Sequence, residues 1–258
     1  MRMNLNLERA FAVVHPSWTK ILRQGLDAIA EKTPHYFNEL LDSHFLPTNG
    51  RIFSAFSQPI ESIRYILMGE SPYPREMSAS GYCFMDAAVQ DIWSEHGLSK
   101  QVNRAVSLRN FIKMLLVADG FLQQEETGKQ AVQQFVENIL VSDQSFIRTC
   151  SELQANMLKS GFLLLNASLV FRKEIPVQKE VNYWEPFIET ILNFLFKYQL
   201  EKPIVLILWG KMAEKFQQRF NQTSYRIIVS EHPYNLSFIK NIQMQTLFQP
   251  LQLLRKNI

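Results

Sequence analysis

The sequence predicts a single α/β domain of three layers, with helices on both faces of a central, four-stranded, mainly parallel sheet. Two observations support this fold class. Four short runs rich in Ile, Leu and Val are typical of strands that are covered on both faces. Amphipathic stretches of helical length lie between them, and strands that alternate with helices favour a parallel sheet. A chain of 258 residues is long enough to bury one such core.

The four predicted strands end at small or polar residues, as buried parallel strands commonly do. They are IRYILMG (63–69), GFLLLNA (161–167), IVLILWG (204–210) and YRIIVS (225–230). Helical periodicity predicts a helix over residues 18–29, with Ser17 as its N-cap, and another over 34–46. Three further amphipathic helices are predicted in SLRNFIKMLLVA (107–118), WEPFIETILNFLFKY (184–198) and KMAEKFQQRF (211–220). No repeat or linker interrupts the chain, so residues 1–258 are predicted to form one domain.

The composition excludes several classes of protein. It is 47% apolar and 20% charged, which is ordinary for a soluble globular protein. No apolar run approaches the roughly 18–20 residues that span a bilayer, and no signal peptide is evident, so we expect no membrane partner. Cys83 and Cys150 have neither a metal-binding spacing nor a disulfide framework, and we expect inert core thiols and a reducing, cytoplasmic location. The net charge of +3 permits a nucleic-acid partner without requiring one.

Unusual polar residues follow three of the predicted strands. Gly69, Glu70 and Ser71 follow the first strand, Asn166 closes the second, and the segment Glu231-His232-Pro233 follows the fourth. In open parallel sheets, ligands bind beyond the carboxyl ends of the strands. The sequence therefore predicts a functional site at this edge of the sheet.

Short motifs in a fixed order run along nearly the whole chain. Near the N-terminus stand HPSW (15–18), YF (36–37) and IFSAF (52–56). Six further segments are GESPYP (69–74), GYCF (81–84), SLRN (107–110), LLLNASL (163–169), LWGKMAEK (208–215) and EHPYNLS (231–237). Each motif alone is weak, but their joint order and spacing resemble those of the family-1 uracil-DNA glycosylases.

The resemblance implies that the chain binds a uracil flipped out of DNA, as an enzyme that acts on one base must do. Phe84 is then expected to stack on the base, and the Asn166 amide to pair with its Watson–Crick edge. Tyr73 is expected to leave no room for the methyl group of thymine. His232 is expected to donate a hydrogen bond to uracil O2 as negative charge develops on the leaving base.

The resemblance also implies contacts to the rest of the DNA. Leu236 is expected to enter the gap that the flipped base leaves in the stack. Ser107, the loop around Leu236 that includes Ser237, and Lys240 are expected to hold phosphates.

Each of these residues also has a purely structural interpretation when it is taken alone. Asn166 resembles a strand-end residue that caps a turn, and His232 before a proline resembles an ordinary loop residue. The remaining three alternatives are core packing for Phe84, turn packing for Tyr73 and a buried anchor for Leu236. Only the joint order of the motifs favours the functional interpretation.

The sequence departs from the family at the residue that matters most for catalysis. Where the family has a water-activating aspartate in GQDPYH, this chain has Ser71, a neutral and weakly basic side chain. Loss of a general base typically costs about 10²–10⁴-fold in rate. Glu70 offers a replacement, because GES resembles the GEA opening of another branch of the superfamily. Two interpretations stay open: Glu70 helps to activate water, or it only accepts backbone hydrogen bonds in the turn.

Other departures concern the segments that grip DNA. Ala105 and Val106 stand where the family has a proline-rich loop, Pro74 replaces the last histidine of the motif, and Tyr234-Asn235 replaces a Ser-Pro pair. FQQRFNQTS (216–224) lacks the glycine of the family's Gly-Ser loop, and FIKNIQMQTLF (238–248) replaces a segment rich in glycine and aromatic residues. Residues 86–106, which include Trp93, are longer than the family's segment and are either a solvated loop or a partner surface.

Two hypotheses follow for the function. The first is a DNA N-glycosylase of base excision repair that acts on uracil in single- or double-stranded DNA, at a reduced rate, with no metal or cofactor. The second is a non-catalytic relative that binds DNA or serves as a scaffold for a protein partner through the altered loops. Either is predicted to be a monomer.

Overall fold

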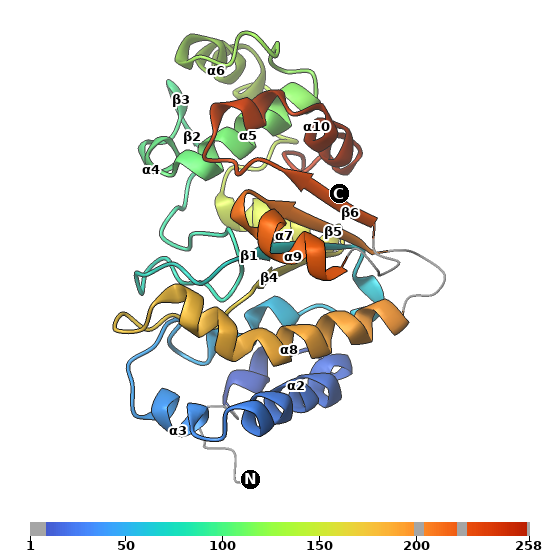
Figure 1. The fold of residues 1–258 in the computed structure, drawn as a ribbon. Helices are drawn as coiled ribbons and strands as arrows, with labels where there is room; N and C mark the ends of the chain where they lie inside the picture. Colours follow the sequence, from blue (N-terminus) through green and yellow to red (C-terminus); the bar gives the residue numbers. More distant parts are fainter. Residues whose placement is uncertain (1–8, 199–203, 221–225, 257–258) are drawn as a thin grey trace. The chain divides into compact units, whose positions relative to one another are not determined.

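The computed structural model describes residues 9–198, 204–220 and 226–256 (Figure 1). The chain divides into two compact units, each assembled from three separate segments. The first comprises Met1–Asp86, Gly161–Leu208 and Lys215–Ile228, and the second comprises Ala87–Ser160, Trp209–Glu214 and Val229–Ile258. The prediction of a single domain stays a prediction. In the described part of the chain, no helix is both long and apolar enough to cross a bilayer.

The central sheet consists of four strands in the order β4-β1-β5-β6 (Figure 1). Their bounds are β1 Tyr65–Gly69, β4 Phe162–Asn166, β5 Val205–Trp209 and β6 Arg226–Ser230. Strand β1 runs parallel to both β4 and β5, with Leu67 opposite Leu164 and Ile207. All five residues of β4 are buried, as expected for a strand that is covered on both faces. The α/β class and the four-stranded parallel sheet are therefore confirmed, and every predicted run contains the expected strand.

Helices α2 (Thr19–Lys32) and α8 (Val177–Tyr198) pack against each other in the first unit. Gly25 permits the close approach, because a Cβ atom there would lie 2.6 Å from the Phe187 ring. The short elements of this unit are η1 Phe11–Val13, η2 Pro16–Trp18, α3 Tyr36–Leu41, η3 Arg51–Phe56 and η4 Ile60–Ser62. Helix α9, Lys211–Phe220, follows β5 as predicted and crosses the boundary between the units.

Three sequence-based helix bounds in this unit are wrong. Ser17 is not an N-cap, because η2 precedes α2 and the Ser17 hydroxyl instead accepts a hydrogen bond from the Ile60 N–H at 3.1 Å. Helix α3 covers only part of the predicted 34–46 segment. Helix α8 begins at Val177, well before the predicted start at 184. Helix ends depend on such tertiary partners, which periodicity does not report.

A buried ion pair lies beside α8 in the first unit. The Arg172 guanidinium donates to both carboxylate oxygens of Glu180, at 2.8 and 3.2 Å. Tyr36 donates its hydroxyl hydrogen to Glu180 at 2.6 Å, and the Trp184 indole N–H donates to the Tyr36 oxygen at 2.6 Å. Every polar group of this cluster therefore has a partner, as burial of charge requires.

The second unit is helical around an aromatic core. Its elements are β2 Trp93–Ser94, β3 Gly97–Leu98, α4 Lys100–Arg104, α5 Val106–Ala118, α6 Lys129–Phe135, the π-helical turn η5 Val136–Leu140, α7 Cys150–Lys159, η6 Leu236–Lys240, α10 Ile242–Phe248 and η7 Gln249–Leu251. The Trp209 ring lies 5.8 Å from Phe111 and 5.3 Å from Phe238, and its N–H donates to the Met244 sulfur. Cys150 in this unit and Cys83 in the first unit are both free and buried, as predicted for core thiols.

The long segment 86–106 is folded. It forms the antiparallel β2–β3 hairpin, in which Trp93 pairs with Leu98, and then helix α4. The Trp93 indole N–H donates to the Ile147 carbonyl at 2.9 Å, and its ring lies 5.5 Å from that of Phe135. The interpretation of this segment as a solvated loop is therefore wrong.

Candidate functional site

The carboxyl ends of β1 and β4 place the side chain of Asn166 against Gly69 in the first unit. The two residues are paired in the sheet. A Cβ atom on Gly69 would clash with Asn166 Oδ1 and would lie 2.7 Å from the Cβ of Cys83, so only glycine fits there. Asn166 as a residue is 4% exposed, and its side-chain oxygen lies against the Cα of Gly69, where no side chain intervenes. The amide therefore lies at the edge of the sheet where a ligand is expected.

The loop between β1 and residue 86 is fastened at one end to the residues that follow β4 and at the other end to β4 itself. The Ser168 N–H donates to the Glu70 carbonyl at 3.0 Å, and the Cys83 N–H donates to the Leu164 carbonyl at 3.0 Å. The Glu70 side chain is exposed and Ser71 is half-buried. The Ser71 hydroxyl donates only a long hydrogen bond, 3.4 Å, to the carbonyl of Pro72. The loop thus begins and ends beside the strand that carries Asn166.

Tyr73 and Phe84 are joined across this loop. The Tyr73 hydroxyl donates to the Phe84 carbonyl at 3.1 Å, and the Ser80 hydroxyl donates to the next carbonyl, that of Met85, at 2.8 Å. Phe84 has a φ of +66°, which is strained for a bulky residue and is retained mostly where the surroundings enforce it. Desolvation, with a smaller effect of the Asp86 charge, raises the pKa of Tyr73 to about 12. The phenol therefore stays protonated and keeps both aromatic residues in place.

His232 is oriented by its own loop in the second unit. The Tyr234 N–H donates to His232 Nδ1 at 3.1 Å, so Nδ1 carries no hydrogen and the neutral ring carries its hydrogen on Nε2. Although the residue is exposed overall, partial desolvation of the ring lowers the pKa of His232. Gly210, at φ +55°, makes room for it, because a Cβ there would lie 2.9 Å from the His232 Cβ. The ring is thereby prepared as a neutral hydrogen-bond donor.

Asn110 is a site residue to which sequence reasoning assigned no role. It is completely buried on α5, and its amide donates to the carbonyls of Pro233 at 2.7 Å and Tyr234 at 3.3 Å. This ties the loop that follows His232 to the helix. A polar amide inside the apolar run of 107–118 was the available signal, because such a residue needs a buried partner.

The candidate DNA-binding residues lie at the surface of the second unit. Leu236 is 68% exposed, so the alternative of a buried anchor is wrong. Ser237 and Lys240 are also exposed, and Ser107 is half-buried in the first turn of α5. The Lys240 carbonyl accepts a hydrogen bond from Gln124 at 3.0 Å, which anchors the end of η6 and leaves the ammonium group exposed.

The predicted site residues therefore form two groups, one in each unit. The first unit brings together Glu70, Ser71, Tyr73, Phe84 and Asn166, and the second carries Ser107, His232, Leu236, Ser237 and Lys240. Of the segment 216–224, which replaces the family's Gly-Ser loop, residues 221–224 lie outside the described residues. No cluster of three potential metal ligands occurs among the residues that the structure describes. The individual roles of the two groups stay predictions.

Curated uracil-DNA glycosylases are similar to this chain over most of its length. The chain is 26% identical to the uracil-DNA glycosylase of Streptococcus mutans over 226 residues, which cover 86% of this chain and 85% of the relative. It is 27% identical to the uracil-DNA glycosylase of Enterococcus faecalis over 238 residues, 87% and 84% of the two chains. No family model matches the chain.

Solved structures give a stronger likeness. The wild-type UNG of Nitratifractor salsuginis is 34% identical to this chain, and the match covers 100% of each chain. The two structures superpose with a TM-score of 0.86. The mimivirus uracil-DNA glycosylase, at 17% identity and a TM-score of 0.54 over 87% of this chain and 71% of its own, shares the fold. The full-length match at 34% identity, together with the named curated relatives, decides the family. The chain belongs to the uracil-DNA glycosylase superfamily.

Proposed function

We propose that this protein binds a uracil flipped out of single- or double-stranded DNA and hydrolyses its N-glycosidic bond, more slowly than an enzyme with an aspartate at position 71. The observation that carries the proposal is the placement of Asn166, which is 4% exposed at the carboxyl end of β4 and whose amide oxygen lies against Gly69. One N–H donor and one carbonyl acceptor on the same amide match the donor–acceptor edge of uracil. Such a step belongs to base excision repair.

The loop geometry supports roles for the two aromatic residues. Phe84 is held at a positive φ by the loop that Tyr73 and Ser80 brace, so its ring is preorganised for stacking on a base. Tyr73 is half-buried and fixed at its hydroxyl, which gives the rigidity needed to exclude a methyl group.

The geometry of His232 supports stabilisation of the leaving base. During hydrolysis the bond between C1′ and uracil N1 breaks, and the uracil leaves with the electron pair. The water oxygen bonds to C1′ and releases one proton, to Glu70 or to solvent. Negative charge then develops on the uracil oxygens. A neutral imidazole that offers Nε2–H stabilises such an anion by a preorganised hydrogen bond.

Ser71 explains the expected loss of rate. A neutral hydroxyl that donates to Pro72 neither deprotonates water nor stabilises positive charge on the sugar as a carboxylate does. We propose that Glu70, whose carboxylate is exposed beside Ser71, supplies part of this function.

Single-turnover cleavage of a uracil-containing oligonucleotide tests the proposal. Ser71→Asp is expected to raise the rate by about 10²–10⁴-fold, because it restores a general base. Ser71→Asn is the matched control, because asparagine has the size of aspartate but no charge. It is expected to leave the rate near that of the natural protein. Glu70→Gln is expected to lower the natural rate. The same oligonucleotide with thymine in place of uracil checks base specificity.

The possible outcomes separate the two hypotheses. Equal rates for Glu70→Gln and the natural protein would exclude Glu70 from catalysis. If neither the natural protein nor Ser71→Asp cleaves, while uracil DNA still binds, the non-catalytic binder or scaffold is the better hypothesis. A cytoplasmic location and a monomeric state stay predictions of the sequence.

A further inference from the structure

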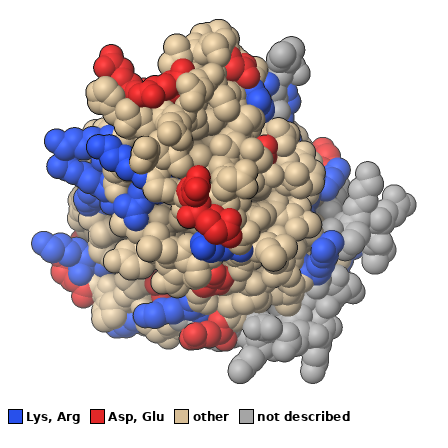
Figure 2. Space-filling view, turned by 90° about the horizontal axis from the view of Figure 1, so that it is seen from above, with Lys and Arg blue, Asp and Glu red and all other residues tan. Residues whose placement is uncertain are grey.

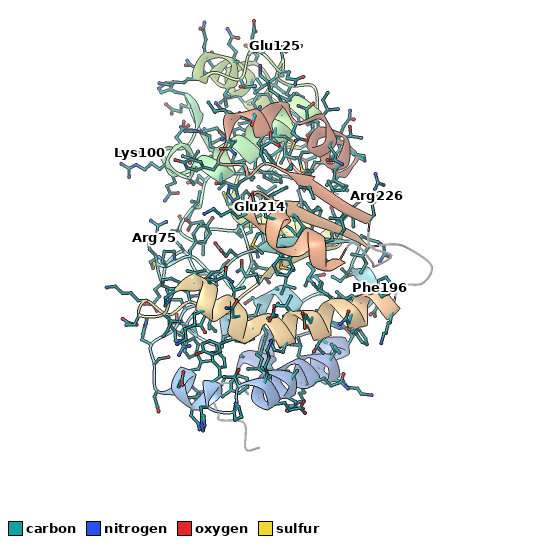
Figure 3. All side chains as sticks on the ribbon, viewed as in Figure 1. Arg75, Lys100, Glu125, Phe196, Glu214 and Arg226 are labelled. Atoms are coloured by element: carbon teal, nitrogen blue, oxygen red, sulfur yellow. The ribbon has the colours of Figure 1, made fainter. Side chains whose placement is uncertain are left out.

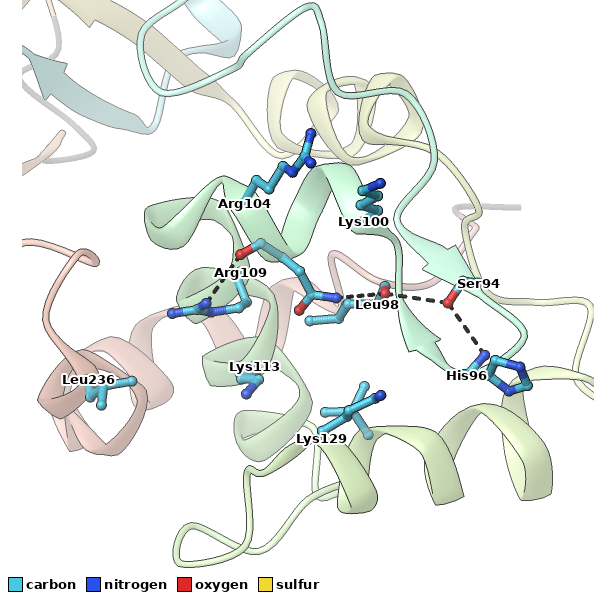
Figure 4. A pocket seen from close by; sticks show the side chains of 11 residues that line it. Ser94, His96, Leu98, Lys100, Arg104, Arg109, Lys113, Lys129 and Leu236 are labelled. Atoms are coloured by element: carbon cyan, nitrogen blue, oxygen red, sulfur yellow. Dashed lines mark hydrogen bonds between the residues drawn. The ribbon is translucent and has the colours of Figure 1, made fainter.

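A pocket of about 690 Å³ opens in the second unit, outside the groups of residues discussed so far apart from Leu236. Figure 4 shows cationic side chains from α4, α5 and α6 around it, with Leu236 at one end. We call it the cationic pocket. It is lined by Ser94, His96, Leu98, Lys100, Asn103, Arg104, Arg109, Lys113, Lys129, Val132 and Leu236.

The lining of the pocket contains five cationic side chains and no carboxylate. In the described part of the chain, Lys100, Arg104, Arg109, Lys113 and Lys129 form no ion pair with a carboxylate. Desolvation, and then the nearby Arg109 charge, lower the pKa of Lys113. Uncompensated charge of one sign in a concave site focuses a positive potential that attracts anions. The geometry and the charge thus select a polyanionic ligand.

The walls of the pocket are fixed before any ligand binds. Asn103 donates to the Leu98 carbonyl at 2.8 Å, and Arg109 donates to the Asn103 carbonyl at 3.2 Å, which joins the hairpin, α4 and α5. The Ser99 hydroxyl accepts the Val102 N–H at 3.1 Å and caps α4. Lys100 projects from this framework toward solvent (Figure 3). A preformed site saves the entropy that ordering the walls would otherwise cost.

Leu236 connects the pocket to DNA. It forms one end of the lining, yet it is 68% exposed and apolar, as a side chain that enters a base stack must be. In the view of Figure 2, a group of Lys and Arg side chains lies at the left of the face, and acidic side chains lie above it, below it and at the centre. The anion that lies beside an opened base step is the phosphate backbone of that DNA.

We propose that the cationic pocket holds the backbone phosphates of DNA on one side of the base step opened by Leu236. This inference rests on the proposed function for the placement of Leu236. A volume of about 690 Å³ corresponds to a cube about 9 Å on a side, which spans roughly two or three nucleotides at the rise of about 3.4 Å per nucleotide of a strand. The segment 86–106, which contributes most of the lining, thereby acquires a function in extending the DNA-binding surface.

The test compares Lys100→Ala/Arg104→Ala with a control of equal charge, Lys159→Ala/Lys256→Ala, whose residues are exposed in the same unit but outside the pocket. Binding is measured by fluorescence anisotropy on a duplex with one tetrahydrofuran abasic analogue, which has no glycosidic bond to cleave. Because each lost phosphate contact reduces the salt slope of log K by about 0.9, the pocket variant is expected to lose about 1 to 2 in slope and to bind about tenfold more weakly. The control is expected to bind like the natural protein.

Two further arms locate the ligand. Shortening the DNA on one side of the lesion is expected to abolish the difference between the pocket variant and the natural protein, while shortening the other side preserves it. Equal affinities and slopes for the pocket variant and the control would overturn the inference. Calorimetric binding of inorganic pyrophosphate, lost in the pocket variant while its DNA binding is unchanged, would assign the pocket to a free anion and would also overturn it.

The outcomes for the pocket and for catalysis are separable. If the natural protein cleaves uracil DNA, and the pocket variant and the control bind DNA equally, the proposed role of the pocket is rejected and the proposed glycosylase activity is kept. The expected loss of slope without cleavage by any variant would keep the pocket as a DNA-binding site and reject the proposed catalysis.

Discussion

At the scale of single residues, backbone contacts decide what the side chains of the candidate site offer. The Tyr234 N–H fixes the tautomer of His232, and the missing side chain of Gly69 makes room for the Asn166 amide. The Phe84 carbonyl receives the Tyr73 hydroxyl. Each contact comes from a neighbour on the same loop or from a paired strand, so small local changes should have large functional effects.

The tautomer of His232 gives a prediction for pH. Because the pKa of His232 is lowered, the ring is still mostly neutral at pH 6.5, the ordinary pKa of a histidine. Protonation at lower pH would place a second hydrogen on Nδ1, where it would face the Tyr234 N–H. The hydrogen bond from the Tyr234 N–H to His232 Nδ1 is therefore present above pH 6.5. It is lost as the pH falls through the pKa that His232 has in the folded protein.

Long-range ¹H–¹⁵N spectra of the imidazole are expected to show the hydrogen on Nε2 at pH 7, and a titration midpoint below 6.5. A hydrogen on Nδ1 at pH 7, or a midpoint above 6.5, would contradict the arrangement.

At the scale of elements, α5 serves two surfaces of the second unit. Arg109 and Lys113 lie one turn apart and line the cationic pocket, while Asn110 faces inward and holds the loop after His232. In the first unit, the cluster beside α8 joins that helix to α3, because Glu180 accepts hydrogen bonds from both Arg172 and Tyr36. These polar contacts, in addition to apolar packing, determine how the elements are positioned.

The buried cluster gives a stability prediction. Glu180→Leu is expected to lower the free energy of unfolding by about 3–5 kcal/mol, because it leaves the Arg172 charge buried without a partner. The double variant Arg172→Met/Glu180→Leu is expected to lose less, because apolar groups of similar volume replace the whole pair. Urea unfolding measures both. A double variant less stable than Glu180→Leu would contradict this expectation. It would show that the attraction between Arg172 and Glu180 exceeds the cost of removing both charges from water.

At the scale of the whole molecule, the two units are interleaved along the chain. Strand β1 lies before residue 160, but both of its partners, β4 and β5, come after it. The second unit likewise needs Trp209–Glu214 and Val229–Ile258 in addition to Ala87–Ser160. No single cut of the sequence therefore separates one complete unit from the other.

A fragment of residues 1–160 is accordingly expected not to fold. Its β1 strand would expose Ile66, Leu67 and Met68 without either neighbouring strand. Circular dichroism is expected to show no cooperative thermal transition for the fragment, in contrast to the full chain. A sharp transition in the fragment would show that residues 87–160 form an independent folding unit.

Charge illustrates what the whole molecule adds to the sequence. The net charge of +3 arises from 27 basic and 24 acidic residues and indicates no strongly basic segment. The fold nevertheless collects five cations around one pocket whose lining has no carboxylate. Their electrostatic effect depends on distance through space, which a sum over the sequence does not contain.

The sequence by itself determined the α/β class, the four strands and the family. Runs of buried apolar residues bounded by polar ends reflect local periodicity, and the motif order at 69–74, 163–169 and 231–237 needs no knowledge of contacts. Helix bounds were less predictable: KMAEKFQQRF matched α9, whereas the cap at Ser17 and the ends of α3 and α8 did not.

Only the tertiary structure decided the placement of the Asn166 amide against Gly69, the strained Phe84, the buried support of Asn110 and the cationic pocket. Two of these depend on residues that are distant in sequence: Gly69 meets Asn166 through strand pairing, and Asn110 meets Pro233 within the second unit. Hydrogen bonding, desolvation and electrostatic potential act over a few ångströms in space. Sequence patterns report which side chains are present, but the fold decides which of them meet.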